Sequence, residues 1–115
     1  MIKNGMRPVH PGEVLLDAFL KSSDPRVNAN RLAKAINVPA NRITAIIKGH
    51  RGITGDTALR FAAFFNTTPE FWMNLQKSYE LRLAEQTLPT EVRYKIAQNG
   101  KALFSAQSHG PSVTD

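Results

Sequence analysis

The chain contains no cysteine among its 115 residues. This absence excludes disulfide frameworks, thiolate metal sites and cysteine nucleophiles, and it is compatible with a reducing cytosol. Long apolar runs are also missing: the longest extends only over residues 61–65, and no apolar stretch follows Lys3 in residues 1–7. Since a membrane span needs about 20 apolar residues, we expect neither a secretion signal nor a membrane segment, and we expect a cytoplasmic protein.

Groups that could catalyse a reaction are sparse. The three histidines, His10, His50 and His109, are far apart in the sequence and lack the spacing of metal ligands. No glycine-rich phosphate loop, nucleophile elbow or paired-carboxylate pattern occurs. A capping or packing role explains His10 and Glu13 better than a ligand role. We therefore predict a protein without enzymatic activity, cofactor, metal or small-molecule substrate.

Acidic residues are few in the first half of the chain. Residues 1–60 contain ten Lys or Arg and four Asp or Glu, whereas residues 61–115 contain five of each, so the net charge of +6 comes entirely from the first half. Such an asymmetric basic charge is typical of a polyanion binder, because neutralised phosphates release counterions. The alternative is an ordinary solubilising surface charge.

Apolar spacing, caps and breakers predict an all-α fold with five helices. The predicted helices cover 11 to about 20, 29–36, 39 or 40 to 48, about 55–65 and 69 to about 86. Residues 91–104 lack a wide apolar face, so a short sixth helix and an irregular segment remain equal alternatives. We divide the chain into an N-terminal arm (1–10), a DNA-binding domain (11–86) and a C-terminal extension (87–115), whose last eleven residues we expect to be disordered.

The second and third predicted helices are short and joined by a tight turn, which is the pattern of a helix-turn-helix motif. Ala33 is the small residue that lets the third helix cross the second closely. Asn37 tolerates the left-handed backbone conformation that ends the second helix, and Val38 follows as an apolar plug. The inner face of the third helix is formed by Ile43, Ile46 and Ile47.

The outer face of the third helix is free to enter the major groove of duplex DNA. Asn41 suits a bidentate contact with adenine, and Ala45 suits contact with a thymine methyl group. Thr44 can donate or accept a hydrogen bond, and Lys48 can reach guanine or a phosphate. We predict as base-reading residues Ala40, Asn41, Thr44, Ala45 and Lys48. The alternative is that these are exposed positions on an ordinary surface helix.

Further polar and basic residues lie at helix starts and in the loop after the third helix. Contacts from such positions to phosphates set the docking of a protein on DNA rather than its choice of sequence. The predicted phosphate contacts are Asn28, Asn30, Arg31, Arg42, His50 and Arg51. Each is also compatible with a plain exposed position.

Four segments carry a resemblance to a known family: residues 10–13 (HPGE), 39–43 (PANRI), 49–60 (GHRGITGDTALR) and 69–76 (PEFWMNLQ). Together they resemble the HigA-type antitoxins, addiction module antidote proteins of the Xre-like helix-turn-helix family, over about residues 7–86. The resemblance implies a lambda-repressor-like domain that dimerises, binds operator DNA and represses its own operon. It also implies a protein partner, a HigB-type toxin that cleaves mRNA.

The fifth predicted helix is a candidate for protein contacts. Residues 69–91 contain four Glu against one Lys and one Arg, and a basic toxin would need such a local acidic patch on a protein of net positive charge. The helix also carries more apolar surface than one buried stripe requires, which suits a dimer seam. The candidate contacts are Trp72, Tyr79, Glu80 and Leu83. Burial of Trp72 and Tyr79 in the monomer core is an equal alternative.

Two other functions fit the same fold. One is a stand-alone Xre-like transcriptional regulator without a toxin partner, and the other is a protein-interaction adaptor that has lost DNA binding. A small basic reading frame beside the gene would favour the antitoxin over the regulator. A steep fall of DNA affinity with salt would exclude the adaptor.

Overall fold

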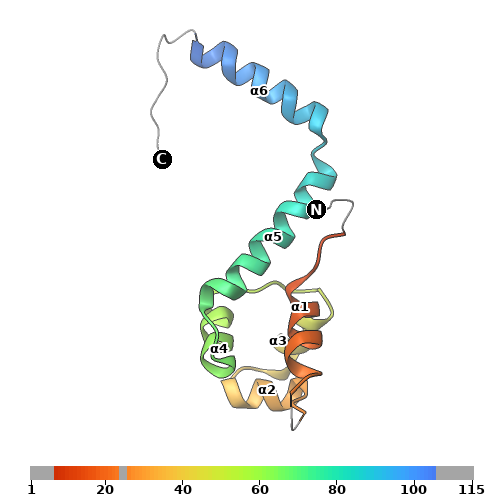
Figure 1. Ribbon diagram of the computed structural model, residues 1–115, viewed down its shortest axis with the longest axis vertical. Coiled ribbons are helices and arrows are strands. Elements are labelled where there is room, and N and C mark those ends of the chain that lie inside the picture. The colour runs from red at the N-terminus through yellow and green to blue at the C-terminus, as the bar shows by residue number, and fades with distance from the viewer. Residues whose placement is uncertain (1–6, 24–25, 106–115) are drawn as a thin grey trace. The chain divides into compact units, whose positions relative to one another are not determined.

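A computed structural model of the protein describes residues 7–23 and 26–105 (Figure 1). All regular structure in these residues is helical: α1 (Pro11–Val14), η1 (Leu15–Leu20), α2 (Ala29–Ile36), α3 (Ala40–Ile47), α4 (Gly55–Phe65), α5 (Pro69–Thr87) and α6 (Thr90–Ser105). The predicted all-α fold is thereby confirmed. The chain divides into two compact units, one up to Arg82 and one from Leu83 onward. Most of the tail that we expected to be disordered lies outside the described residues.

The first predicted helix consists of two segments, because α1 passes directly into the π-helical segment η1. His10 caps its start: the Nδ1 atom of this side chain accepts a hydrogen bond from the Gly12 backbone N–H at 2.9 Å, and Pro11 occupies the first helical position. The capping role expected for His10 is thus confirmed. The π geometry was not predicted, since apolar spacing alone does not distinguish it from an α-helix.

The helix-turn-helix motif is formed by α2 and α3. The Asn28 side chain caps α2 by accepting a hydrogen bond from the Arg31 backbone N–H at 2.8 Å. The helix ends at Asn37, which adopts the left-handed conformation with φ 63° and ψ 51°. The backbone N–H of Val38 then donates to the Ala33 carbonyl oxygen at 2.9 Å, which satisfies one of the last carbonyls of α2. The predicted turn is therefore present where the sequence placed it.

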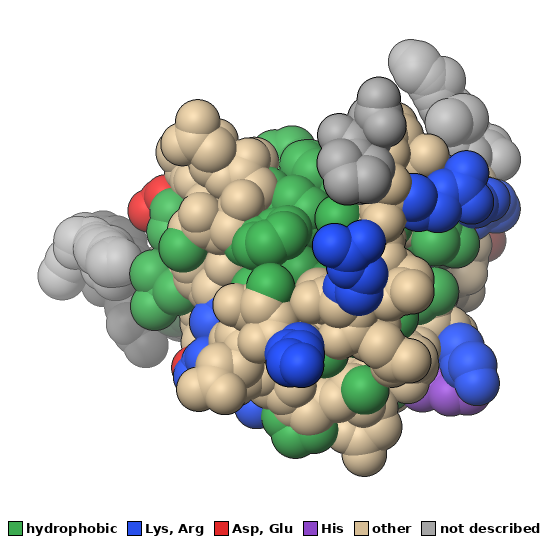
Figure 2. Space-filling model, turned by 90° about the horizontal axis from the view of Figure 1, so that it is seen from below, with side chains coloured by type: hydrophobic (Ala, Val, Ile, Leu, Met, Phe, Trp, Pro, Cys, Tyr) green, Lys and Arg blue, Asp and Glu red, His purple; other side chains and the backbone are tan. Residues whose placement is uncertain are grey.

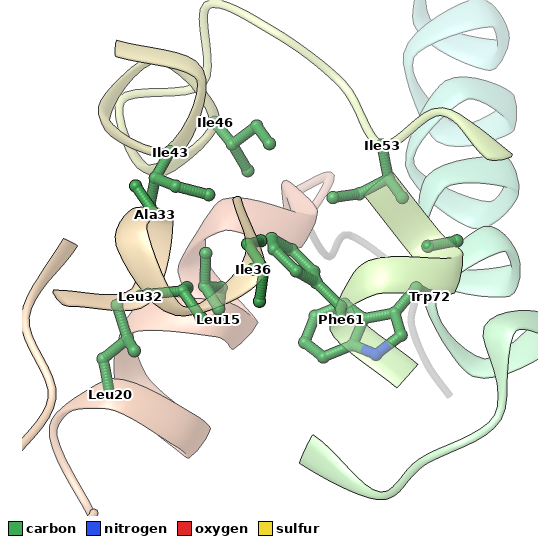
Figure 3. Packing of buried hydrophobic residues seen from close by; sticks show 11 residues of the cluster. Leu15, Leu20, Leu32, Ala33, Ile36, Ile43, Ile46, Ile53, Phe61 and Trp72 are labelled. Atoms are coloured by element: carbon green, nitrogen blue, oxygen red, sulfur yellow. The ribbon is translucent and has the colours of Figure 1, made fainter. Parts of the chain in front are cut away.

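A single hydrophobic core holds α3 on the rest of its unit. In the close view, Leu32 and Ile36 of α2 and Ile43 and Ile46 of α3 point toward the same interior as Phe61 (Figure 3). Further buried members of this core are Leu15, Leu20, Ala33, Ile53, Ala58 and Trp72. Because the core takes side chains from η1, α2, α3, α4 and α5, the orientation of α3 depends on all of these helices.

One close approach fixes the crossing of α1 and α3. A Cβ atom added to Gly12 would lie 1.9 Å from the backbone oxygen of Ile46. No side chain fits at that distance, so position 12 requires glycine for α1 to pass this close to the end of α3.

The unit from Leu83 onward includes α6, whose existence the sequence left open. The helix extends over 16 residues, and none of them is buried. Its apolar side chains are largely exposed, as in Ile96 (54%) and Leu103 (67%). The absence of a buried face explains why apolar periodicity gave only a weak signal for this helix.

Candidate nucleic-acid interface

The outer face of α3 presents the residues predicted to read bases. Ala40, Asn41 and Lys48 are exposed, and Thr44 and Ala45 are half-buried. Ile43 and Ile46, on the inner face of the same helix, have no exposed surface. The structure therefore gathers the five predicted side chains on one side of α3, directly opposite the buried isoleucines.

The start of α2 contributes a second group of polar residues. Asn28, Asn30 and Arg31 are all exposed. The Asn28 side chain is engaged in capping α2, which holds the first turn of the helix in place. Backbone N–H groups at a helix N-terminus attract anions, so this turn can receive a phosphate.

The loop after α3 carries His50 and Arg51, both of which are exposed. Gly49 starts this loop with φ +80°, a conformation that L side chains rarely adopt. Neither His50 nor Arg51 takes part in an ion pair with another described residue. Their side chains are therefore available to a ligand.

Gln76 of α5 holds the end of this loop, and sequence reasoning missed its role. The Ile53 backbone N–H donates to Gln76 Oε1 at 2.7 Å in a buried hydrogen bond. Gly52 makes room for this contact, because a Cβ atom there would lie 2.7 Å from Gln76 Nε2. No local signal in the sequence identifies this role, because the partner of Gln76 lies 23 positions away. Gln76 also donates to Glu80 at 2.7 Å.

His10 lies beside both this loop and α5. Its ring packs edge-on against Tyr79 of α5, with ring centroids 4.7 Å apart, and it interacts with the Arg51 backbone. Burial lowers the pKa of His10, although the Glu13 carboxylate and the Arg51 backbone act in the opposite direction. A neutral imidazole is the form that can accept the Gly12 hydrogen bond, so burial and capping favour the same protonation state.

Arg42 differs from the other predicted phosphate contacts. Its Nη1 atom donates to the Asp56 carboxylate at 2.7 Å, and only 23% of its side chain is exposed. Its Nε atom is buried and has no hydrogen-bond partner among the described residues. The guanidinium of Arg42 is therefore engaged within the protein rather than extended into solvent.

The four candidate protein contacts on α5 occupy different environments. Trp72 is fully buried and donates from Nε1 to Thr67 at 2.8 Å, so it belongs to the core. Tyr79 is half-buried against His10. Glu80 and Leu83 are exposed. Of the two roles considered for Trp72, the structure shows the core role.

The surface at the α2 end of Figure 1 is displayed in Figure 2. Lys and Arg side chains stand out across this face, and Asp and Glu side chains are visible only at its edges. A face of this kind attracts polyanions. Within the part of the chain that the structure describes, no group of His, Cys, Asp and Glu side chains is arranged to hold a metal ion. No described helix is long and apolar enough to cross a membrane.

Comparison with known proteins extends this description. Residues 28–72 match the family model Helix-turn-helix. A curated relative, Virulence-associated protein I of Dichelobacter nodosus, is 44% identical over 84 residues, which cover 73% of this chain and 76% of that protein.

Two solved structures are similar over most of their length. One is an addiction module antidote protein of the HigA family from Coxiella burnetii, with 49% identity and a TM-score of 0.71, covering 77% of this chain and 95% of that one. The other is a Pseudomonas aeruginosa protein in complex with its operator DNA, with 40% identity and a TM-score of 0.73, covering 79% of this chain and 96% of that one.

Proposed function

The chain belongs to the HigA family of helix-turn-helix antitoxins, and from this premise we propose that it binds operator DNA sequence-specifically through the outer face of α3. The observation that carries the proposal is the arrangement of α3, in which Asn41 and Lys48 are exposed opposite the buried Ile43 and Ile46. A helix held by one face can enter the major groove with the other.

Each side chain on this face has a matching chemistry on base edges. Asn41 pairs with adenine through two hydrogen bonds, and the methyl group of Ala45 contacts the methyl group of thymine. Thr44 donates to or accepts from either type of base pair, and Lys48 reaches guanine or a phosphate. Ala40, at the start of the helix, leaves room for close approach to the groove.

Phosphate contacts come from two sites beside α3. Asn28, Asn30 and Arg31 at the start of α2 form one site, and His50 and Arg51 in the loop after α3 form the other. Side chains and backbone N–H groups in such places fix the register of a protein on the duplex. The loop keeps its position because Gln76 and His10 hold it from α5 and from the start of α1.

We infer further that the protein acts in the cytoplasm as a homodimer, represses its own operon and neutralises a HigB-type mRNA endonuclease. The Coxiella burnetii relative is an antidote protein, and the Pseudomonas aeruginosa relative is bound to its operator. Tyr79, Glu80 and Leu83 provide a half-buried aromatic ring, an exposed carboxylate and an exposed apolar side chain for these protein contacts. Catalysis is no part of the proposal.

The experiment that tests DNA binding is a titration of the purified full chain with a duplex from its own upstream region and a scrambled duplex of equal length. We expect tighter binding to the upstream duplex. Asn41→Ala should weaken that binding by about 1–3 kcal/mol and relax preference at one base pair. Lys77→Ala, on an exposed position of α5, is the control. Unchanged affinity and base preference in Asn41→Ala would exclude this reading face.

A second experiment separates an antitoxin from a stand-alone regulator. If a small basic reading frame lies beside the gene, its product is co-expressed with the chain, and growth and co-purification are measured. Rescue of growth together with a stable complex supports the antitoxin. DNA binding without such a partner would leave a regulator of the same fold.

A further inference from the structure

Arg42 lies in the first turn of α3, beside the reading residue Asn41, where an arginine would ordinarily contact a DNA phosphate. In this structure its guanidinium instead donates to Asp56 Oδ2 of α4 at 2.7 Å. The side chain is 23% exposed and that of Asp56 is 55% exposed. The pair thus ties the start of α3 to the start of α4 at the edge of the candidate interface.

Asp56 has a second partner that extends this link. Arg60, one turn further along α4, donates from Nε to the same Asp56 Oδ2 atom at 2.9 Å. The two guanidinium groups, with Arg60 contributing more, hold the pKa of Asp56 below its ordinary value. One carboxylate therefore joins an arginine of α3 to an arginine of α4.

Arg60 also reaches the helix-turn-helix turn itself. Its Nη1 atom donates to the backbone oxygen of Ile36 at 2.8 Å and to that of Asn37 at 3.4 Å. These carbonyls end α2, where the helix dipole favours a cation and the last carbonyls lack helical partners. These consecutive contacts thus connect α3 through α4 to the end of α2.

We propose that Arg42, Asp56 and Arg60 form a brace that sets the angle of α3 relative to α2, and that Arg42 acts in this brace as a positioning residue rather than as a phosphate contact. The inference rests on the proposed function, since the angle of α3 decides whether Asn41 and its neighbours meet the base edges. A shift of about 1 Å at the start of a reading helix is enough to break bidentate pairing.

If the brace exists, removing the negative charge of Asp56 should change the DNA affinity in the opposite direction to that expected from charge repulsion alone. Removing an acidic charge near a DNA-binding face ordinarily strengthens binding to every sequence. If Asp56 holds the brace, Asp56→Asn should instead weaken binding to the upstream duplex on the order of tenfold and leave binding to the scrambled duplex nearly unchanged. Arg42→Ala should behave in the same way.

The dependence of affinity on salt separates the two roles of Arg42. Loss of one phosphate contact lowers the log–log salt slope by about 0.9. We expect that change for Arg51→Ala, the matched control in the exposed loop, and an unchanged slope for Arg42→Ala. The double variant Arg42→Ala/Asp56→Asn should be no weaker than either single variant, because both remove the same brace. Circular dichroism checks that each variant is folded.

Three results would overturn the brace: stronger binding of Asp56→Asn to both duplexes, a slope reduced by about 0.9 in Arg42→Ala, or additive losses in the double variant. Hydrogen exchange of the free protein gives an independent test. Asp56→Asn should speed exchange of backbone amides at the start of α3 and the end of α2, and unchanged exchange would also reject the brace. If the wild type does not discriminate between the duplexes, the proposed function fails. The hydrogen-exchange result then decides by itself whether the brace exists.

Discussion

The helices α3 and α6 differ in how the chain supports them. α3 has eight residues, too few for a stable isolated helix, yet Ile43 and Ile46 are completely buried on its inner face. α6 has 16 residues and none of them is buried. The helix α3 therefore exists because of tertiary packing, whereas α6 forms without a buried apolar face of its own. Changes that act through packing should damage α3 and leave α6 nearly untouched.

The largest expected effect is on the free energy of unfolding, and it is measured with a buried isoleucine and an exposed one as its control. Ile43→Ala removes a fully buried side chain and should lower the free energy of unfolding by about 2–5 kcal/mol, since it loses transfer energy and leaves a cavity. Ile96→Ala, at a position that is 54% exposed, should change it by less than about 0.5 kcal/mol. Urea unfolding of the full chain measures both. Equal losses in the two variants would show that α6 is buried in solution, for example in a dimer.

Two glycines test the same difference between packed α3 and exposed α6, here through the backbone. Gly12→Ala would place a Cβ atom 1.9 Å from the Ile46 oxygen, so α1 must move away from α3, and we expect a loss of about 1–3 kcal/mol. Gly100→Ala meets nothing within 4 Å. It should stabilise the helix by about 0.5–1 kcal/mol through higher helix propensity.

Thermal unfolding monitored by circular dichroism, together with DNA titration, checks the glycine pair. Gly12→Ala should weaken DNA binding as well as stability, because α1 packs on the end of α3, the helix that we propose to read DNA. A stable Gly12→Ala protein with full affinity would contradict the close approach. A destabilised Gly100→Ala protein would mean that something contacts α6 at this position.

The sequence predicted most helix boundaries correctly because caps are local. Asn28 caps α2 and Thr54 caps α4 through contacts only three residues away, and Asn37 and Asn66 end helices in the left-handed region. Burial of Ile43 and Ile46 and partial burial of Ile47 in α3 followed from helical periodicity. The face of α3 that we propose to read DNA is the complement of that buried face, and could therefore be predicted as well.

The contacts that position this face could not be predicted, because they join residues far apart in the sequence. Gln76 meets Ile53 across 23 positions, and Arg60 meets Ile36 across 24. A polar residue at such a position looks like any other surface residue until the helices are placed. The same limit hides the ion pair of Arg42 from the sequence, since its partner Asp56 lies in another helix.

The smallest effect we expect is a pH dependence confined to the unit that holds α3. The pKa of His10 is lowered by burial, so the unfolded chain binds a proton at this residue more readily than the folded chain does. Stability linked to His10 is therefore complete above the ordinary histidine pKa of about 6.5 and decreases as pH falls through and below it. Protonation also removes the acceptor for the Gly12 N–H, which loosens the cap of α1.

His10→Asn isolates this contribution, because asparagine caps helices but does not titrate. The melting temperature of the wild type should fall more between pH 7.5 and 5.5 than that of His10→Asn, and the two proteins should differ least at the acidic end. Glu13 does not confound this window, since its pKa is lowered by Arg7 and its carboxylate stays ionised throughout. Parallel pH profiles in the two proteins would mean that His10 is not held neutral beside Tyr79.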